Sequence, residues 1–156
     1  VIAGDVSDHG LEIDGPEGSA TGRFTLKNAT VFGATDDCDA EGVDGEMADF
    51  RKGATGDVSN ILFRDFAGGK DVELDASADA ATYTAGTLTF ANIDIMHPLS
   101  GGAVCSNVET LNQIFDDKSD ESTFEADAST FAEIVTEQKQ GNGVDTSVFS
   151  WTFYAR

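Results

Sequence analysis

Phe24-Thr-Leu-Lys-Asn28-Ala-Thr-Val-Phe32, Gly56-Asp-Val-Ser-Asn60-Ile-Leu-Phe-Arg64 and Leu88-Thr-Phe-Ala-Asn92-Ile-Asp-Ile-Met96 align without gaps around an asparagine. The asparagines are 32 residues apart in both intervals. On each side of the asparagine, apolar and polar residues alternate with period 2, as in a strand with one buried face. The alternation changes phase at the asparagine, a residue that tolerates left-handed backbone conformations, so we expect a bend there. Both halves of each stretch then present apolar residues to one interior: Leu26, Val58 and Phe90 before the asparagine, and Ala29, Ile61, Ile93, Val31, Phe63 and Ile95 after it.

A short strand-like run precedes each stretch, namely Leu11–Asp14, Ala48–Arg51 and Val72–Asp75. Each repeat is therefore predicted to be a short strand, a turn of variable length and a bent strand pair. Stacking such repeats about 4.8 Å apart gives an all-β fold, a right-handed parallel β-helix (solenoid). A β-sandwich, which also has short alternating strands, is the alternative. The solenoid predicts that Asn28, Asn60 and Asn92 stack at one corner, bonded to backbone of adjacent coils, and that Phe63, Phe90 and Ile95 are buried.

The pattern changes after Cys105, which indicates β-helix coils over residues 1–105 and a C-terminal cap of the same domain over residues 106–156. The cap is predicted to contain two short helices, a polar loop between them and a final aromatic strand. The helices are expected over Asn107–Phe115 and Ala128–Gln138, the loop over Asp116–Asp127 and the strand over Ser147–Tyr154. Such a segment suits the cover of an open solenoid core. The alternative role of the aromatic strand is a platform for glycan.

The charge balance excludes one large class of function. Twenty-nine acidic residues oppose nine basic ones, giving a net charge of −20. This surface repels nucleic acid and attracts divalent cations. No stretch approaches the ~20 apolar residues of a transmembrane helix. Cys38 and Cys105 are far apart and lack zinc-ligand spacing, so they form either one disulfide or two thiols.

The metal hypothesis concerns an acidic loop. Asp37-Cys-Asp39-Ala-Glu41-Gly42 matches the opening of an EF-hand calcium loop, but Ala48 stands where its bidentate glutamate belongs. The sequence thus favours at most a looser calcium loop, and a solvated acidic turn is the alternative. Its candidate ligands are Asp37, Asp39, Glu41 and Asp44. A weaker candidate consists of Asp116, Asp117, Asp120 and Glu121.

A catalytic hypothesis rests on the short strands. Glu12 with Asp14, and Glu73 with Asp75, place two carboxylates on the same face of each strand. Polysaccharide lyases and hydrolases use such carboxylates, and Arg51 and Lys52 from the intervening coil could complete the site. The alternative, which we favour, is that Arg51 neutralises stacked acids in a charged ladder, because like charges on adjacent strands repel.

Four motifs resemble a known family. They are Asp8-His-Gly-Leu-Glu-Ile-Asp-Gly-Pro-Glu-Gly-Ser19, Ala48-Asp-Phe-Arg-Lys-Gly53, Asp71-Val-Glu-Leu-Asp75 and Val148-Phe-Ser-Trp-Thr152. In this order they are similar to the C-terminal part of β-helical surface lipoproteins of Bacteroidota, which are often mislabelled "multidrug transporter". The resemblance implies the solenoid fold, export to the extracellular or outer-membrane surface, and a longer N-terminal portion with a lipoprotein signal and earlier coils.

We therefore expect a non-catalytic cell-surface structural or binding module for glycan, partner protein or self-association. The alternative is a β-helical carbohydrate-active enzyme, a polysaccharide lyase or hydrolase, acting through Glu12, Asp14, Arg51, Glu73 and Asp75. Calcium is the only cofactor that the residues suggest. We also expect Val1–Asp14 to be covered by earlier coils of the parent chain, another copy or a protein partner, because a solenoid end without a cap leaves an unpaired strand.

Overall fold

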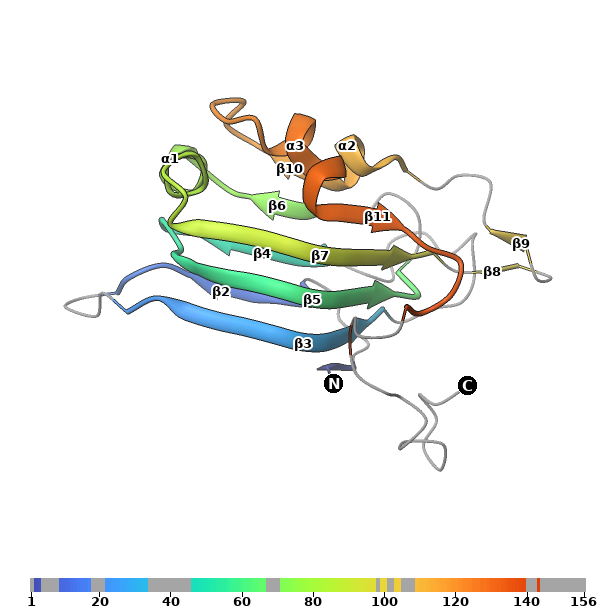
Figure 1. Ribbon diagram of the computed structural model, residues 1–156. Helices are drawn as coiled ribbons and strands as arrows, with labels where there is room; N and C mark the ends of the chain where they lie inside the picture. Colours follow the sequence, from blue (N-terminus) through green and yellow to red (C-terminus); the bar gives the residue numbers. More distant parts are fainter. Residues whose placement is uncertain are drawn as a thin grey trace.

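The chain folds into two parallel β-sheets whose apolar faces share one core. The structure, a computed structural model, describes residues 2–3, 9–17, 22–33, 46–66, 71–97, 99–100, 103–104, 109–139 and 143. The five-stranded sheet has the order β1-β3-β5-β7-β11, and the four-stranded sheet has the order β10-β6-β4-β2 (Figure 1). The first comprises β1 (Ile2–Ala3), β3 (Phe24–Phe32), β5 (Gly56–Arg64), β7 (Leu88–Met96) and β11 (Ala132–Ile134). The second comprises β10 (Phe115–Asp117), β6 (Val72–Leu74), β4 (Ala48–Arg51) and β2 (Glu12–Asp14), and β8 (Leu99–Ser100) pairs antiparallel with β9 (Ala103–Val104).

The three long strands keep the register that the 32-residue spacing predicts. Phe24 pairs with Gly56 and Gly56 with Leu88, and this pairing continues along the strands except at the asparagines. Asn28, Asn60 and Asn92 have left-handed φ values of 56°, 56° and 53°. Their side-chain amides bond to one another, Asn60 Nδ2 to Asn28 Oδ1 at 2.9 Å and Asn92 Nδ2 to Asn60 Oδ1 at 3.1 Å. The predicted stacking is confirmed, but the partners are neighbouring amides instead of backbone.

The change of phase at each asparagine keeps apolar side chains on the core side of the sheet. Val58 before Asn60, and Ile61 and Phe63 after it, are all buried. The four-stranded sheet contributes Phe50 and Leu74 to the same cluster. Phe63 and Ile95 are buried as predicted, 2% and 1% exposed, whereas Phe90 is only partly buried.

The prediction of a right-handed parallel β-helix is wrong. The described residues form two open parallel sheets with helices in their connections, an α/β-like arrangement, and no closed solenoid. Both halves of each long stretch remain in one sheet, so the asparagine is a local irregularity of a single strand and does not divide a coil into two faces. Helix α1 (Ser77–Thr84), which the sequence analysis did not predict, connects β6 to β7.

Short helices cover one end of the core, although their bounds differ from those predicted. Helix α2 (Leu111–Ile114) is shorter than the expected Asn107–Phe115, and α3 (Phe124–Phe131) begins within the expected loop. The residues after α3 form β11, which extends the five-stranded sheet beside β7. Phe124 and Phe131 pack against Phe90 at this end, and Phe115 packs against both of them, with ring-centroid distances of 5.1–5.7 Å in this cluster. The predicted aromatic strand Ser147–Tyr154 lies outside the described residues.

The opposite end of the core has no comparable cover among the described residues. Strand β2 ends the four-stranded sheet, and β3 is paired on its outer side only at Val31 and Phe32, by β1 (Figure 1). We call this end, with its partly buried apolar residues Leu11, Ile13, Phe24 and Leu26, the open end. A groove of about 500 Å³ runs beside it and is lined by Ile13, Phe24 and Thr55 among others. None of the helices in the described part of the chain is long and apolar enough to span a bilayer.

Candidate acidic sheet face

Four carboxylates lie in one row across the outer face of the four-stranded sheet. Inward-facing Phe50 and Leu74 fix the direction of their neighbours, since successive side chains of a strand alternate between faces. Glu12 pairs in register with Asp49, Asp49 with Glu73 and Glu73 with Asp116. We call these four residues the acid row. Adjacent strands are about 4.8 Å apart, so like charges meet at every step of the row.

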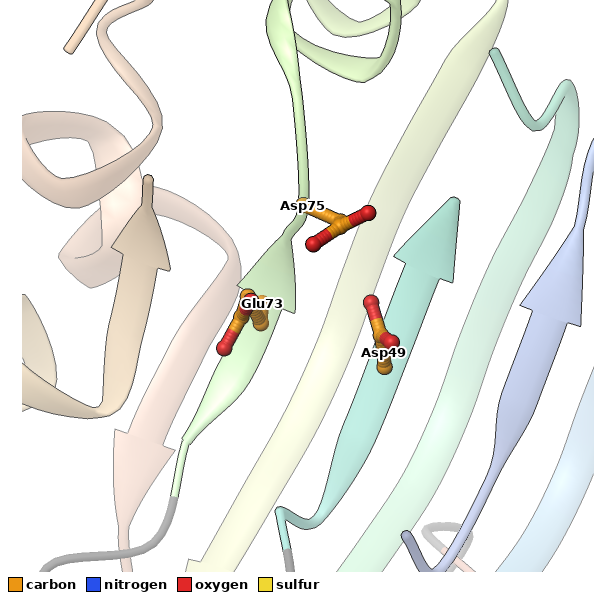
Figure 2. A group of neighbouring side chains, drawn as sticks. All are labelled: Asp49, Glu73 and Asp75. Carbon is orange, nitrogen blue, oxygen red and sulfur yellow. The ribbon is translucent and has the colours of Figure 1, made fainter. Parts of the chain in front are cut away.

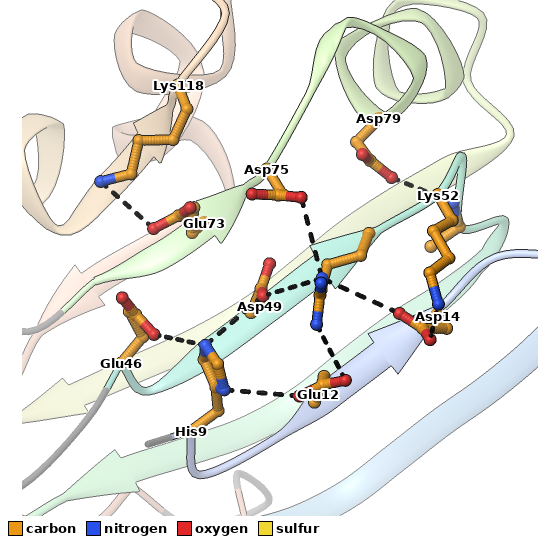
Figure 3. Close-up of polar contacts among 12 residues, drawn as sticks. His9, Glu12, Asp14, Glu46, Asp49, Lys52, Glu73, Asp75, Asp79 and Lys118 are labelled. Atoms are coloured by element: carbon orange, nitrogen blue, oxygen red, sulfur yellow. Dashed lines mark hydrogen bonds and ion pairs between the residues drawn. The ribbon is translucent and has the colours of Figure 1, made fainter. Parts of the chain in front are cut away.

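A second row, next to the first, supplies the compensating cations. Arg51 Nη1 lies 3.0 Å from Glu12, and Arg51 Nε lies 3.5 Å from Asp49 and 3.7 Å from Asp75 (Figure 3). Glu12 is the main reason that the pKa of Arg51 is raised. Lys52 Nζ contacts Asp14 at 2.5 Å. Arg51 thus links β2, β4 and the residue that follows β6.

The residues of the catalytic hypothesis are brought together on this face. Glu12, Asp14, Glu73 and Asp75 surround Arg51 or lie in the next strand, as the repeat alignment implied. Arg51 is held by carboxylates on both sides. A cation in such contacts neutralises its neighbours and reduces the repulsion between carboxylates on adjacent strands.

Asp49 is one residue of this face that sequence reasoning missed. It is 4% exposed, and burial raises its pKa to about 6, while His9 opposes this shift and Asp75 adds to it. Its Oδ2 lies 3.4 Å from His9 Nε2, but its Oδ1 is buried and has no hydrogen-bond partner in the part of the chain that the structure describes. The alignment of Ala48–Arg51 with the strands of Glu12 and Glu73 contained the signal, since it places an acid in the same column.

Two groups of three carboxylates share Glu73. In the first group, oxygens of Asp49, Glu73 and Asp75 all lie within 4.8 Å of one another (Figure 2). In the second group, oxygens of Asp71, Glu73 and Asp116 do the same. Burial is the main cause of the raised pKa values of Glu73 and of Asp71, the latter to about 6. Both groups therefore concentrate negative charge where water screens it poorly.

Lys118 occupies the second group. Its Nζ lies 2.8 Å from Asp116, 3.2 Å from Glu73 and 3.8 Å from Asp71. The hydrogen bond to Asp116 is the main cause of the raised pKa of Lys118. No motif singles out this lysine in the sequence, because it follows β10 in a segment predicted to be a loop.

The remaining predicted ligands fall elsewhere. Asp37, Asp39, Glu41 and Asp44 lie outside the described residues, as do Cys38 and Cys105. The weaker group is divided, because Asp116 faces outward while Asp117 is buried and binds its own loop. Its carboxylate accepts bonds from backbone and hydroxyl groups of Ser119 and Ser122. Burial alone would raise the pKa of Asp117, but these bonds together lower it.

Comparison of the chain with protein-family models, curated proteins and solved structures returned no match. The resemblance to Bacteroidota surface lipoproteins therefore stays a prediction.

Proposed function

We propose that the chain is a non-catalytic structural and binding module of an exported, cell-surface protein, and that its open end takes up β-strands from a protein partner, from another copy or from a preceding part of a longer parent chain. The observation that carries the proposal is the difference between the two ends of the core. One end is covered by α2, α3 and the phenylalanines of α3 and β10, whereas at the other end the edges of β2 and of most of β3 are unpaired among the described residues.

The strand edges of the open end supply the affinity in this proposal. The free edge of β2, and residues Phe24–Ala29 on the outer side of β3, have no strand partner among the described residues. Unpaired edges of this kind bind added strands through backbone hydrogen bonds. Both edges are parallel strands of sheets that share one core, so one incoming segment can extend both.

Apolar side chains between the two edges supply the driving force. Leu11, Ile13, Phe24 and Leu26 are only partly buried, whereas Phe50, Ile61 and Leu74 deeper in the same core are 1% exposed or less. Covering a large apolar side chain is worth about 1.5–3 kcal/mol. The open end thus has both the directional and the hydrophobic components of a strand-binding site.

The acidic face supports a non-catalytic role for the module. Arg51 of the catalytic hypothesis lies in the row next to the acid row. Its guanidinium is shared among Glu12, Asp49 and Asp75. The net charge of −20 favours solubility and excludes nucleic acid as a partner. Export to the extracellular or outer-membrane surface rests on the family resemblance. Glycan is the alternative ligand.

The test is the association state of the chain and of two lysine variants. Leu26→Lys places a charge inside the open end, and Thr25→Lys is the matched control, because Thr25 lies on the exposed outer face of the same strand. We expect sedimentation velocity to show concentration-dependent association of the wild type, abolished by Leu26→Lys and retained by Thr25→Lys. The outward-facing amides of β2 and of Phe24–Ala29 in β3, which do not bond to β4 or β5, should become protected from hydrogen exchange on association. A monomer at every concentration, with fast exchange in β2 and β3, contradicts self-association and, if a glycan array then gives binding, favours glycan.

A further inference from the structure

We propose that Asp49, Glu73 and Asp75 form a calcium-binding site on the outer face of the four-stranded sheet. This site is separate from the acidic loop of the sequence analysis and does not depend on the proposed function, since it lies on the outer sheet face and not at the open end. Its ligand atoms are carboxylate oxygens from β4, from β6 and from the residue that follows β6 (Figure 2).

The spacing of the three carboxylates fits calcium. Their oxygens lie within 4.8 Å of one another. Calcium binds oxygen at about 2.3–2.6 Å, so two of its ligands on opposite sides are about 4.6–5.2 Å apart. Magnesium binds oxygen at about 2.0–2.1 Å in near-ideal octahedral geometry and usually keeps several waters, so three protein carboxylates at one site suit the more flexible coordination of calcium better. Water completes the coordination of a calcium ion held by few protein ligands.

Asp49 provides an observation independent of the acidic cluster. Its Oδ1 is buried and has no hydrogen-bond partner among the residues that the structure describes, although the side chain is more than nine-tenths buried. In Figure 3 this oxygen points away from His9 and toward Asp75. A buried carboxylate oxygen without a partner is costly, and a cation between the three carboxylates satisfies it.

The neighbouring cations leave carboxylate oxygens of the Asp49–Glu73–Asp75 group available and occupy the second group. Lys118 Nζ is within 3.8 Å of all three carboxylates of the Asp71–Glu73–Asp116 group, so an ion there would have to displace the ammonium. In the first group, Arg51 contacts Oδ2 of Asp49 and Oδ2 of Asp75, and Lys118 contacts only the shared Glu73, so Oδ1 of Asp49 keeps no cation partner among the described residues. The first group therefore keeps ligand capacity that the second has lost.

The experiment isolates this face from the acidic loop. The full chain carries Asp37→Asn, Asp39→Asn, Glu41→Gln and Asp44→Asn as a background, which removes the loop's candidate ligands. Calcium chloride is titrated into the metal-free protein by isothermal titration calorimetry, with far-UV circular dichroism in chelator to show that each variant is folded. We expect one ion per chain, bound with a dissociation constant on the order of 0.1–1 mM, the range of extracellular calcium modules.

Four further substitutions in this background decide the assignment. Asp49→Asn and Asp75→Asn should weaken calcium binding at least tenfold. Asp71→Asn and Asp116→Asn, which alter only the group occupied by Lys118, should change it less than threefold. A folded background protein that binds no calcium overturns the proposal, as does the reverse pattern, in which Asp71→Asn and Asp116→Asn abolish binding and Asp49→Asn does not.

Discussion

Asn60 donates its side-chain amide to Asn28 over 2.9 Å, and both residues hold the same left-handed φ of 56°. The backbone conformation and the hydrogen bond are linked, because the irregularity at each asparagine is what places the amides one above another. Asn60 also accepts a hydrogen bond from Asn92 at 3.1 Å. It is therefore the central residue of this hydrogen-bonded series of three asparagines, which we call the asparagine ladder.

Replacement of Asn60 should separate these two contributions. Asn60→Gly keeps the left-handed backbone and loses the two amide bonds, and we expect a loss of about 1 kcal/mol in the free energy of unfolding. Asn60→Ala also forces a non-glycine residue without a local hydrogen bond into the left-handed region, and should lose about 2 kcal/mol. Urea unfolding measures both. Equal losses for the two variants would show that the backbone conformation contributes nothing.

Phe63→Ala should destabilise the fold by about 3–5 kcal/mol, because it removes a buried ring and leaves a cavity. Phe63 is 2% exposed and contacts Phe66 at a ring-centroid distance of 6.3 Å. The control is Ile134→Ala at a side chain that is 40% exposed, for which we expect less than about 1 kcal/mol. Chemical denaturation of both variants checks the contrast, and similar losses would contradict the position of Phe63 in the core.

Asp71→Asn should stabilise the protein at neutral pH. The folded-state pKa of Asp71 is raised to about 6, mainly by burial and then by Glu109, so the folded state binds the proton more tightly than the unfolded state does. Ionised Asp71 is therefore destabilising above pH 6, and this penalty disappears as the pH falls from 6 toward 4. We expect the variant to be more stable by about 1 kcal/mol at pH 7.5, less than the full shift implies because the carboxylate keeps solvent contact.

The measurement for Asp71→Asn is urea unfolding of both proteins in chelator at pH 7.5, 6.0 and 4.5. The difference in stability should shrink at each step. A constant difference across the three pH values would show that the amide acts through packing and not through the charge.

Arg51→Gln should tighten calcium binding by the outer sheet face several-fold. The guanidinium lies 3.5 Å from Asp49 and 3.7 Å from Asp75, so it repels an ion held by the same carboxylates. Lys52→Gln is the control, because Lys52 contacts Asp14 and Glu17 instead. Calorimetry in the loop-substituted background compares the two, and weaker binding by folded Arg51→Gln would place the ion elsewhere.

The sequence predicted the elements of the sheets better than their assembly. Period-2 alternation and the shared asparagine identified the three long strands and the short strand before each, because both signals are local. The equal 32-residue spacing suggested that every repeat is the same coil, and this prediction was wrong. In the first interval the long connection precedes β4, whereas in the second it follows β6 and contains α1. The two intervals are equal in length but unlike in structure.

The candidate site was predictable only as far as the repeat alignment reached. The alignment of Glu12 with Glu73 correctly predicted that their strands belong to one sheet. Arg51 contacts the stacked acids, as the charged ladder predicted. Asp116 belongs to β10 and Lys118 follows it directly, and this part of the chain carries no repeat signal. The burial of Asp49 depends on the side chains packed around it, which alternation along one strand does not reveal.

The asparagine ladder has a direction. Each amide nitrogen donates to the asparagine of the preceding long strand. Within the described residues the series therefore ends at Asn28, whose Oδ1 already accepts a hydrogen bond and whose Nδ2 can still donate one. A strand that joins the sheet beside β3 therefore meets a donor and not an acceptor at that position. The ladder is selective for a parallel strand that offers an asparagine or aspartate oxygen there, and an added strand with lysine at that place would leave two donors opposed.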